Sequence, residues 1–147
     1  LDAIPVLEDA AGGGANAVVA VSPTATSPAL TGRSDWLFRV CPSDVAASMA
    51  AAAHVADSLG ARRAAVVYRN DPYGRDWTAA FERAFRERGG TLVLHDPYVA
   101  GVTEWAALAG HVGLLGADVV LFPGSAEDAA ELHRALRSAG VAVPVVG

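Results

Sequence analysis

The sequence contains no lysine, and all eleven of its basic residues are arginines. It has a single cysteine, Cys41, which excludes an internal disulfide and leaves the redox compartment open. No apolar run approaches the length of a transmembrane helix, and no charged segment with a cleavage site marks a signal peptide. The first residue is Leu1, which favours a processed product or a piece of a longer protein. The net charge of −5 argues against a nucleic-acid partner, because such proteins usually present a basic face.

The motifs of common enzymes and metal sites are also missing. The four histidines are dispersed without HExxH spacing, and there is no GxSxG, no P-loop lysine and no GxGxxG after a strand. Cys41 precedes Pro42 near a strand end and is typical of a small core residue. Asp71 alone resembles a phospho-acceptor, but the acidic pair and the lysine of a receiver domain are absent. The sequence therefore predicts no catalytic residue, no metal and no cofactor.

The most informative stretch reads as a strand, a loop and a helix in succession. Residues 64–68 form a short apolar run rich in valine, as in a strand that is covered on both faces. Apolar residues then recur at helical spacing from Trp77 to Phe85, which predicts a helix with one buried stripe. Two glycines, at 89 and 90, end this helix because glycine adopts the left-handed backbone of a C-cap. The loop 70–74 lies at the carboxyl end of the strand, where open α/β sheets bind ligands.

Strands and helices alternate through the rest of the chain. We expect strands at 17–21, 36–41, 91–95, 119–122 and 143–146, and helical segments at 4–11, 43–59, 103–115 and 127–139. From Ala64 onward the order is βαβαβαβ, which predicts a three-layer α/β/α fold with a mostly parallel sheet and right-handed crossovers. Two of the helices have predicted inward faces, formed by Val45, Met49, Ala52, Ala56 and Leu59 and by Trp105, Leu108, Ala109, Val112 and Leu115.

Four loops follow predicted strands, at residues 22–26, 70–74, 96–101 and 124–127. In the first of them, Ser22, Thr24 and Thr26 offer hydroxyl and backbone N–H groups to a small anion such as a carboxylate. The alternative is that these residues only cap turns.

Two further side chains have a binding and a structural interpretation. Tyr73 either stacks on a ligand or packs on its own helix. Ser125 and Glu127 either contact a ligand, or Ser125 is an N-cap whose partner three residues later is Asp128, as in a capping box. The residues alone leave both alternatives open.

Four segments, taken together and in this order, resemble the type I periplasmic binding proteins. They are SPTATSPALT at 22–31, FRVCPSD at 38–44, AAVVYRNDPYGRDWTAAF at 64–81 and DVVLFPGSAEDAAELHRALRSAG at 118–140. The branch they resemble most is the branched-chain amino-acid (leucine/isoleucine/valine) subgroup of ABC-transporter receptors. The resemblance covers essentially the whole chain.

The resemblance implies two α/β lobes that close on a ligand in the cleft between them. Residues 1–60 would be the end of the first lobe and the crossover, and residues 61–147 the first half of the second lobe. The Ser-x-x-Ala-Thr loop would hold the head group of an amino acid. The implied ligand residues are Ser22, Ala25 and Thr26 from that loop, Tyr73 from the Asp-x-Tyr-Gly loop, and Ser125.

The implied function is the extracytoplasmic receptor of an ABC transporter, periplasmic or a cell-surface lipoprotein, with an amino acid or similar small polar molecule as its ligand. Its partner would be the membrane permease, and a central piece of such a receptor would form homo-oligomers. A ligand-sensing domain of a regulator or receptor kinase with the same fold is one alternative. A flavodoxin-like enzyme or receiver domain is the other.

Overall fold

The computed structural model describes residues 19–32, 36–101 and 103–147. Contacts divide the chain into two compact units, Leu1–Asp44 and Val45–Gly147. The helix expected at 4–11 and the first residues of the strand expected at 17–21 lie outside the described residues. The lobe boundary expected at residue 60 stays a prediction.

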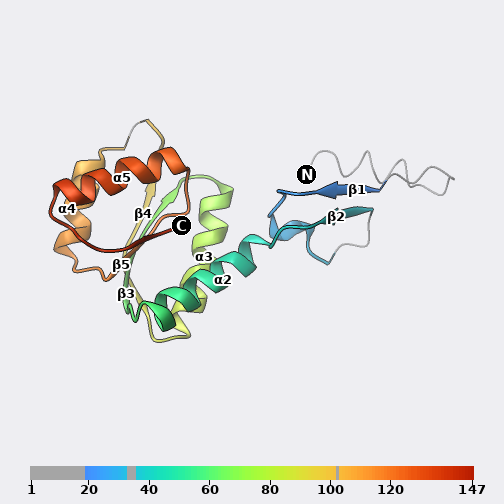
Figure 1. Cartoon of the computed structure of the whole chain (residues 1–147), viewed down its shortest axis with the longest axis horizontal. Helices are drawn as coiled ribbons and strands as arrows, with labels where there is room; N and C mark the ends of the chain where they lie inside the picture. The colour runs from blue at the N-terminus through green and yellow to red at the C-terminus, as the bar shows by residue number, and fades with distance from the viewer. Residues whose placement is uncertain (1–18, 33–35, 102) are drawn as a thin grey trace. The chain divides into compact units, whose positions relative to one another are not determined.

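The first unit contains a short parallel pair of strands. Strand β1 (Ala20–Ser22) pairs with β2 (Leu37–Arg39), with Val21 opposite Phe38 (Figure 1). A 3-10 helix, η1 (Pro28–Leu30), lies between them in the sequence, and Ser27 caps it by accepting a bond from the Ala29 N–H at 3.3 Å. Both strands confirm the sequence prediction. Strand β1 continues one residue beyond its expected end, to Ser22, and β2 ends at Arg39, because Pro42 lacks the N–H that the next bond of the ladder would need.

One face of this strand pair is apolar and exposed. Val21 is 60% exposed and Phe38 is 54% exposed, and each alternates with less exposed neighbours along its strand. Val19, two residues before Val21, and Val40, two residues after Phe38, flank the strands on the same face and are also exposed.

The second unit contains a four-stranded sheet in the order β4-β3-β5-β6, in which every strand pair is parallel. The strands are β3 (Arg63–Arg69), β4 (Thr91–Tyr98), β5 (Val119–Leu121) and β6 (Val145–Val146). The central strand β3 contains five consecutive buried residues, as expected for a strand that is covered on both faces. The predicted order βαβαβαβ from Ala64 is confirmed.

Helices cover both faces of this sheet, so the predicted three-layer α/β/α fold is confirmed. The helices are α2 (Asp44–Ala53) with its π-helical continuation η2 (His54–Ser58), α3 (Pro72–Arg86), α4 (Trp105–Leu114) and α5 (Ala126–Ser138) (Figure 1). The α2–η2 segment and α3 pack with Val66 and Tyr68 in one cluster. Helices α4 and α5 pack with Val67 and Val120 in the other.

Helix α3 has the buried stripe that the spacing predicted. Trp77, Ala80, Phe81, Ala84 and Phe85 are all buried, and the Phe81 ring stacks on the Phe85 ring at a centroid distance of 5.2 Å. The chain leaves the helix through Gly89, whose φ of 80° lies in the left-handed region that favours glycine.

The predicted inward face of the helix at 43–59 is partly wrong. Met49 is 46% exposed and Leu59 is 42% exposed, whereas Ser48 and Val55 are fully buried. Alanine fills so much of this helix that several faces look apolar, so the sequence does not fix which one packs. Leu59 also follows a π-helical turn, where its N–H bonds to the His54 carbonyl and the regular helical phase is lost.

Two predictions are wrong around β4 and α4. The strand predicted to stop at 95 runs on to Tyr98, so residues 96–98 are not loop. Pro97 is tolerated there because β4 is the edge strand of the sheet. Leu115, predicted to face inward, follows the last residue of α4 and is 38% exposed.

No helix in the parts of the chain that the structure describes combines the length and the apolar character that crossing a bilayer requires.

Candidate functional site

The loop after β1 is fixed by hydrogen bonds to its backbone. The Ser22 hydroxyl accepts a bond from the Ala25 N–H at 3.0 Å. The Thr26 carbonyl accepts bonds from the Asp44 N–H at 2.9 Å and from the Arg39 guanidinium at 3.4 Å. These bonds fix the backbone of the loop that carries the hydroxyl groups of Ser22, Thr24 and Thr26.

The hydroxyl groups of this loop can still form hydrogen bonds to a ligand. The Ser22 hydroxyl accepts from Ala25 and still has its own hydrogen to donate. Thr24 is exposed and Thr26 is half-buried, and no described residue bonds to either hydroxyl. The turn-capping interpretation is therefore correct for Ser22, and it leaves the binding interpretation open for all three residues.

The loop after β3 begins α3 in close contact with the strand. Asp71 caps the helix by accepting a bond from the Gly74 N–H at 2.8 Å, and it forms an ion pair with Arg69 at 3.3 Å. A side chain at Gly74 would collide with the backbone carbonyl of Arg69, so only glycine permits this approach. Tyr73 lies in the first turn of α3 and is 43% exposed.

The loop after β5 begins α5. Ser125 is its N-cap, and its hydroxyl accepts a bond from the Asp128 N–H at 3.2 Å and donates one to the Asp128 carboxylate at 2.8 Å. The capping interpretation of Ser125 and Asp128 is therefore confirmed. Because the hydroxyl has already donated its hydrogen, only a remaining lone pair and the backbone of this residue are open to a ligand.

Tyr98 is an important residue of this edge that the sequence analysis missed. It is 1% exposed, and its ring stacks on Phe122 at 5.0 Å and lies against Trp105 at 5.1 Å. Its hydroxyl donates to the Asp128 carboxylate at 3.0 Å and accepts from the Ser125 N–H at 3.4 Å. Burial and the bond to Asp128 together raise the pKa of Tyr98 to about 12.

Tyr73, in the first turn of α3, and Ser125, the N-cap of α5, lie at the same edge of the four-stranded sheet, because both follow parallel strands of that sheet. Ser22, Thr24, Ala25 and Thr26 lie together in the loop of the first unit.

Two hollows open at that edge of the second unit. One, of 310 Å³, is lined by Arg69, Asn70, Asp71, Tyr98, Val99 and Ala100. The other, of 320 Å³, is lined by Phe122, Gly124, Ser125, Ala126, Ala129, Val145 and Gly147. Both are lined by polar and apolar groups, as sites for small molecules are.

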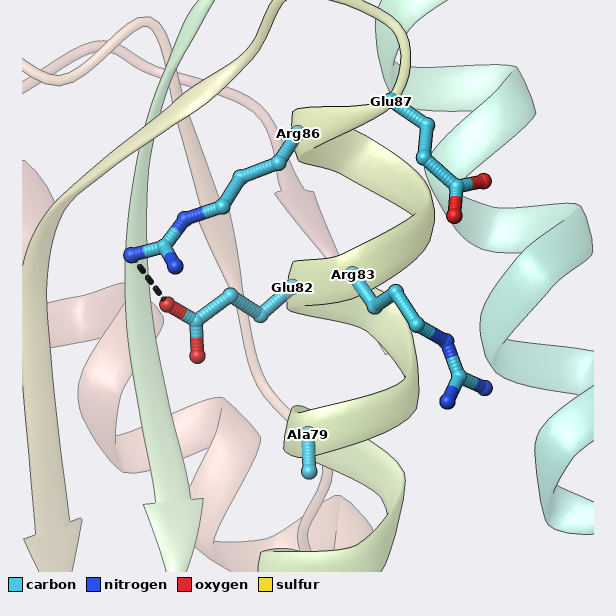
Figure 2. Close-up of a pocket in the computed structure, with 5 residues that line it drawn as sticks. All are labelled: Ala79, Glu82, Arg83, Arg86 and Glu87. Carbon is cyan, nitrogen blue, oxygen red and sulfur yellow. Dashed lines mark ion pairs between the residues drawn. The ribbon is translucent and has the colours of Figure 1, made fainter.

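A larger hollow, of 410 Å³, lies along α3 away from these loops. Figure 2 shows that Ala79 and four charged side chains from the C-terminal half of α3 and its C-cap line it. Arg86 is paired with Glu82 at 2.6 Å. Charged side chains on one exposed helix surface do not enclose a ligand, so we assign no site there. In the described residues no group of three or more His, Cys, Asp or Glu side chains is arranged to hold a metal ion.

An open parallel sheet between helical layers places this chain among the α/β folds that bind ligands at the carboxyl edge of the sheet. The sequence pattern of the periplasmic binding protein family matches residues 4–147, and the chain belongs to that family.

Individual relatives agree with this assignment. A Leu/Ile/Val-binding protein homolog from Brucella melitensis is 33% identical over 133 residues, which is 90% of this chain and 36% of that protein. A Leu/Ile/Val-binding protein from Rhizobium johnstonii is 31% identical over 90% of this chain and 36% of its own length. This chain therefore spans about a third of the curated relatives it matches.

A solved structure matches the fold. The ABC transporter substrate-binding protein from Desulfitobacterium hafniense, in complex with Leu, aligns with a TM-score of 0.77 and 29% identity. The alignment covers 97% of this chain and 42% of that one.

Proposed function

We propose that this chain is part of the extracytoplasmic receptor of an ABC transporter, that it binds an amino acid or a similar small polar molecule, and that it is not an enzyme. The observation that carries the proposal is the loop Ser22–Thr26, with its hydroxyl groups at the carboxyl end of β1 and its backbone fixed by Arg39 and Asp44. Relatives named as Leu/Ile/Val-binding proteins support the ligand class, and a substrate-binding protein in complex with Leu does so as well.

In this proposal each loop has a separate task. The hydroxyls of Ser22 and Thr26 and the backbone N–H groups near Ala25 bind the polar head group of the ligand. Tyr73, exposed at the start of α3, covers the ligand with its ring. The loop that begins at Ser125 contributes backbone groups, because its side-chain hydroxyl is already bonded to Asp128. Closure of two lobes around the ligand would signal the bound state to the permease.

The proposal is tested by amide chemical shifts of this chain during titration with leucine, valine and a polar amino acid. We expect weak, saturable binding, because the chain holds only part of the length of its relatives. The shifting amides should be those of residues 22–26 and 70–74. No shift at millimolar concentrations of any of these amino acids would overturn the proposal.

We also propose that the chain forms a homo-oligomer through the apolar face of β1 and β2. Val21 and Phe38 are adjacent on that face and more than half exposed, and exposed apolar patches promote association. Light scattering at micromolar concentration should give at least the mass of a dimer, and the double substitution Val21→Ser with Phe38→Ser should reduce it. A monomer mass for the unchanged chain would refute the proposal, and Val99→Ser, exposed on the second unit, is the control.

A further inference from the structure

Three loops meet around one buried tyrosine at the carboxyl edge of the four-stranded sheet. Tyr98 is the last residue of β4, and its backbone carbonyl accepts a bond from the Asn70 N–H at 2.9 Å. Its hydroxyl accepts from the Ser125 N–H at 3.4 Å and donates to Asp128 at 3.0 Å. The backbone of Tyr98 thus holds the loop after β3, and its side chain holds the loop after β5.

The surroundings of the hydroxyl leave it little freedom. The ring is stacked on Phe122 with an angle of 16° between the planes, and Trp105 lies against it at 54°. A side chain at Gly124 would collide with both the Tyr98 hydroxyl and the Phe122 ring. The backbone of the loop after β5 therefore approaches the Tyr98 hydroxyl as closely as a glycine allows. Binding residues are held in place by this kind of close packing, together with hydrogen bonds from residues behind them.

Asp128 completes the arrangement. Its carboxylate accepts from the Tyr98 hydroxyl and from the Ser125 hydroxyl, while its own N–H donates back to the Ser125 hydroxyl. Ser125 is thus held through its hydroxyl by Asp128 and through its N–H by Tyr98. A second connection joins the same loops where the Arg69 N–H donates to the Pro123 carbonyl at 3.3 Å.

We propose that Tyr98 is a positioning residue for ligand binding, which fixes the loop of Tyr73 and the loop of Ser125 relative to each other through Asn70, Ser125 and Asp128. The inference rests on the proposed function, because it assigns Tyr98 a role in the affinity of that site. Tyr98 is only 1% exposed, so in this proposal it acts on the two loops and not through the ligand.

The link that Tyr98 makes between the two loops, called the tie below, can be tested without a ligand by hydrogen exchange of the backbone amides in the full chain. Tyr98→Phe keeps the ring stacking and removes only the hydroxyl. We expect the amide of Ser125 to exchange at least about tenfold faster and the amides at the centre of β3 to stay unchanged. The matched control is Tyr68→Phe, a buried tyrosine at the end of β3 whose ring stacks on His95 at 4.9 Å on the other face of the sheet. Equal exchange in Tyr98→Phe and the unchanged chain would overturn the tie.

The link to binding is tested by titrating leucine into the same variants. Tyr98→Phe should weaken binding by about threefold to tenfold, because the loop after β5 loses the two hydrogen bonds that the hydroxyl makes to Ser125 and Asp128. Asp128→Asn keeps an acceptor for the Tyr98 hydroxyl and should restore part of the affinity that Asp128→Ala loses. A merely structural role would instead lower the melting temperature of all these variants, Tyr68→Phe included, without separating their affinities.

The two proposals fail in different ways. If the unchanged chain binds no amino acid, the proposed function is wrong, and the exchange experiment still decides whether Tyr98 holds the loops. If the chain binds leucine and Tyr98→Phe binds it equally well, the positioning role is wrong and the proposed function stands.

Discussion

The two units of this protein use similar residues with opposite results. In the second unit, Phe81 and Val66 are fully buried between the sheet and its helices. In the first unit, Phe38 is 54% exposed and Val21 is 60% exposed. Among the described residues of the first unit, only Asp44 is buried.

The difference lies in the layers and not in the strands. The second unit has four parallel strands with helices on each face, and α3, α4 and α5 each follow a strand of that sheet in the sequence. The described part of the first unit has two strands of three residues and one turn of 3-10 helix. A pair of strands alone cannot enclose an apolar core, so its stability depends on what else packs against it.

The strongest test of this comparison is to truncate one phenylalanine in each unit. Phe81→Ala should cost about 3–5 kcal/mol in the free energy of unfolding, because it leaves a cavity beside Trp77 and Phe85. Phe38→Ala should change that free energy by no more than about 0.5 kcal/mol at concentrations where the chain is monomeric, because the ring is then more than half exposed. Urea unfolding of the two variants measures both values, and similar losses would show that the first unit has a core of its own.

The free energy of unfolding should fall at alkaline pH because of Tyr98 in the second unit. Its pKa rises from 10.0 to about 12 on folding, so the folded state keeps the phenolic proton that the unfolded state loses. The stabilisation is complete below pH 10, and it is lost as the pH rises towards 12. It amounts to roughly 2–3 kcal/mol, at 1.36 kcal/mol for each unit of pKa.

The measurement is the free energy of unfolding against pH for the unchanged chain and for Tyr98→Phe. The unchanged chain should lose stability more steeply over that range, because only it carries the buried phenol. Parallel slopes would contradict the assigned pKa of Tyr98.

Within the first unit, Thr26→Ala should affect ligand binding far more than stability. We expect a loss of about 1–3 kcal/mol in the binding free energy of an amino acid, because a desolvated ligand oxygen loses its partner. The unfolding transition should barely move, since the Thr26 bonds in the structure come from its carbonyl. Calorimetry of binding measures the loss, with Thr91→Ala, exposed at the start of β4, as the control. Unchanged affinity in Thr26→Ala would remove this loop from the site.

The smallest effect is expected from Tyr73→Ala. We expect a loss of about 0.5–1.5 kcal/mol in affinity from the missing ring contact, with little change in melting temperature. Tyr68→Ala is the matched comparison. Tyr68 is 9% exposed, so its truncation should lower the melting temperature by several degrees. If Tyr73→Ala destabilises the chain as much as Tyr68→Ala does, Tyr73 is a packing residue of its helix.

Much of the fold was predictable because its signals are local. The order of strands and helices, the stripe from Trp77 to Phe85 and the cap at Ser125 each depend on residues within one or two turns of each other. Such patterns act before any long-range contact forms, so they are readable in one sequence.

The sequence proposes the parts of the candidate site and not their arrangement. The hydroxyl loop at Ser22 and the loop of Tyr73 carry residue types that suit a polar ligand, and their roles stay a prediction. The tie through Tyr98 was missed, because its three partners are 27 to 30 residues away in the sequence. The available signal was an aromatic residue ending a strand directly after Pro97.

The sequence by itself determined the fold class, because alternating apolar runs and amphipathic helices allow few arrangements other than a parallel sheet between helical layers. Only the tertiary structure decided which face of the alanine-rich α2 packs, and that β4 continues through Pro97. It also decided that a phenol hydroxyl holds two loops together. The physical reason is the same in all three cases. Contacts with residues distant in the sequence stabilise one of several local arrangements of similar energy, and a local sequence pattern contains no information about those contacts.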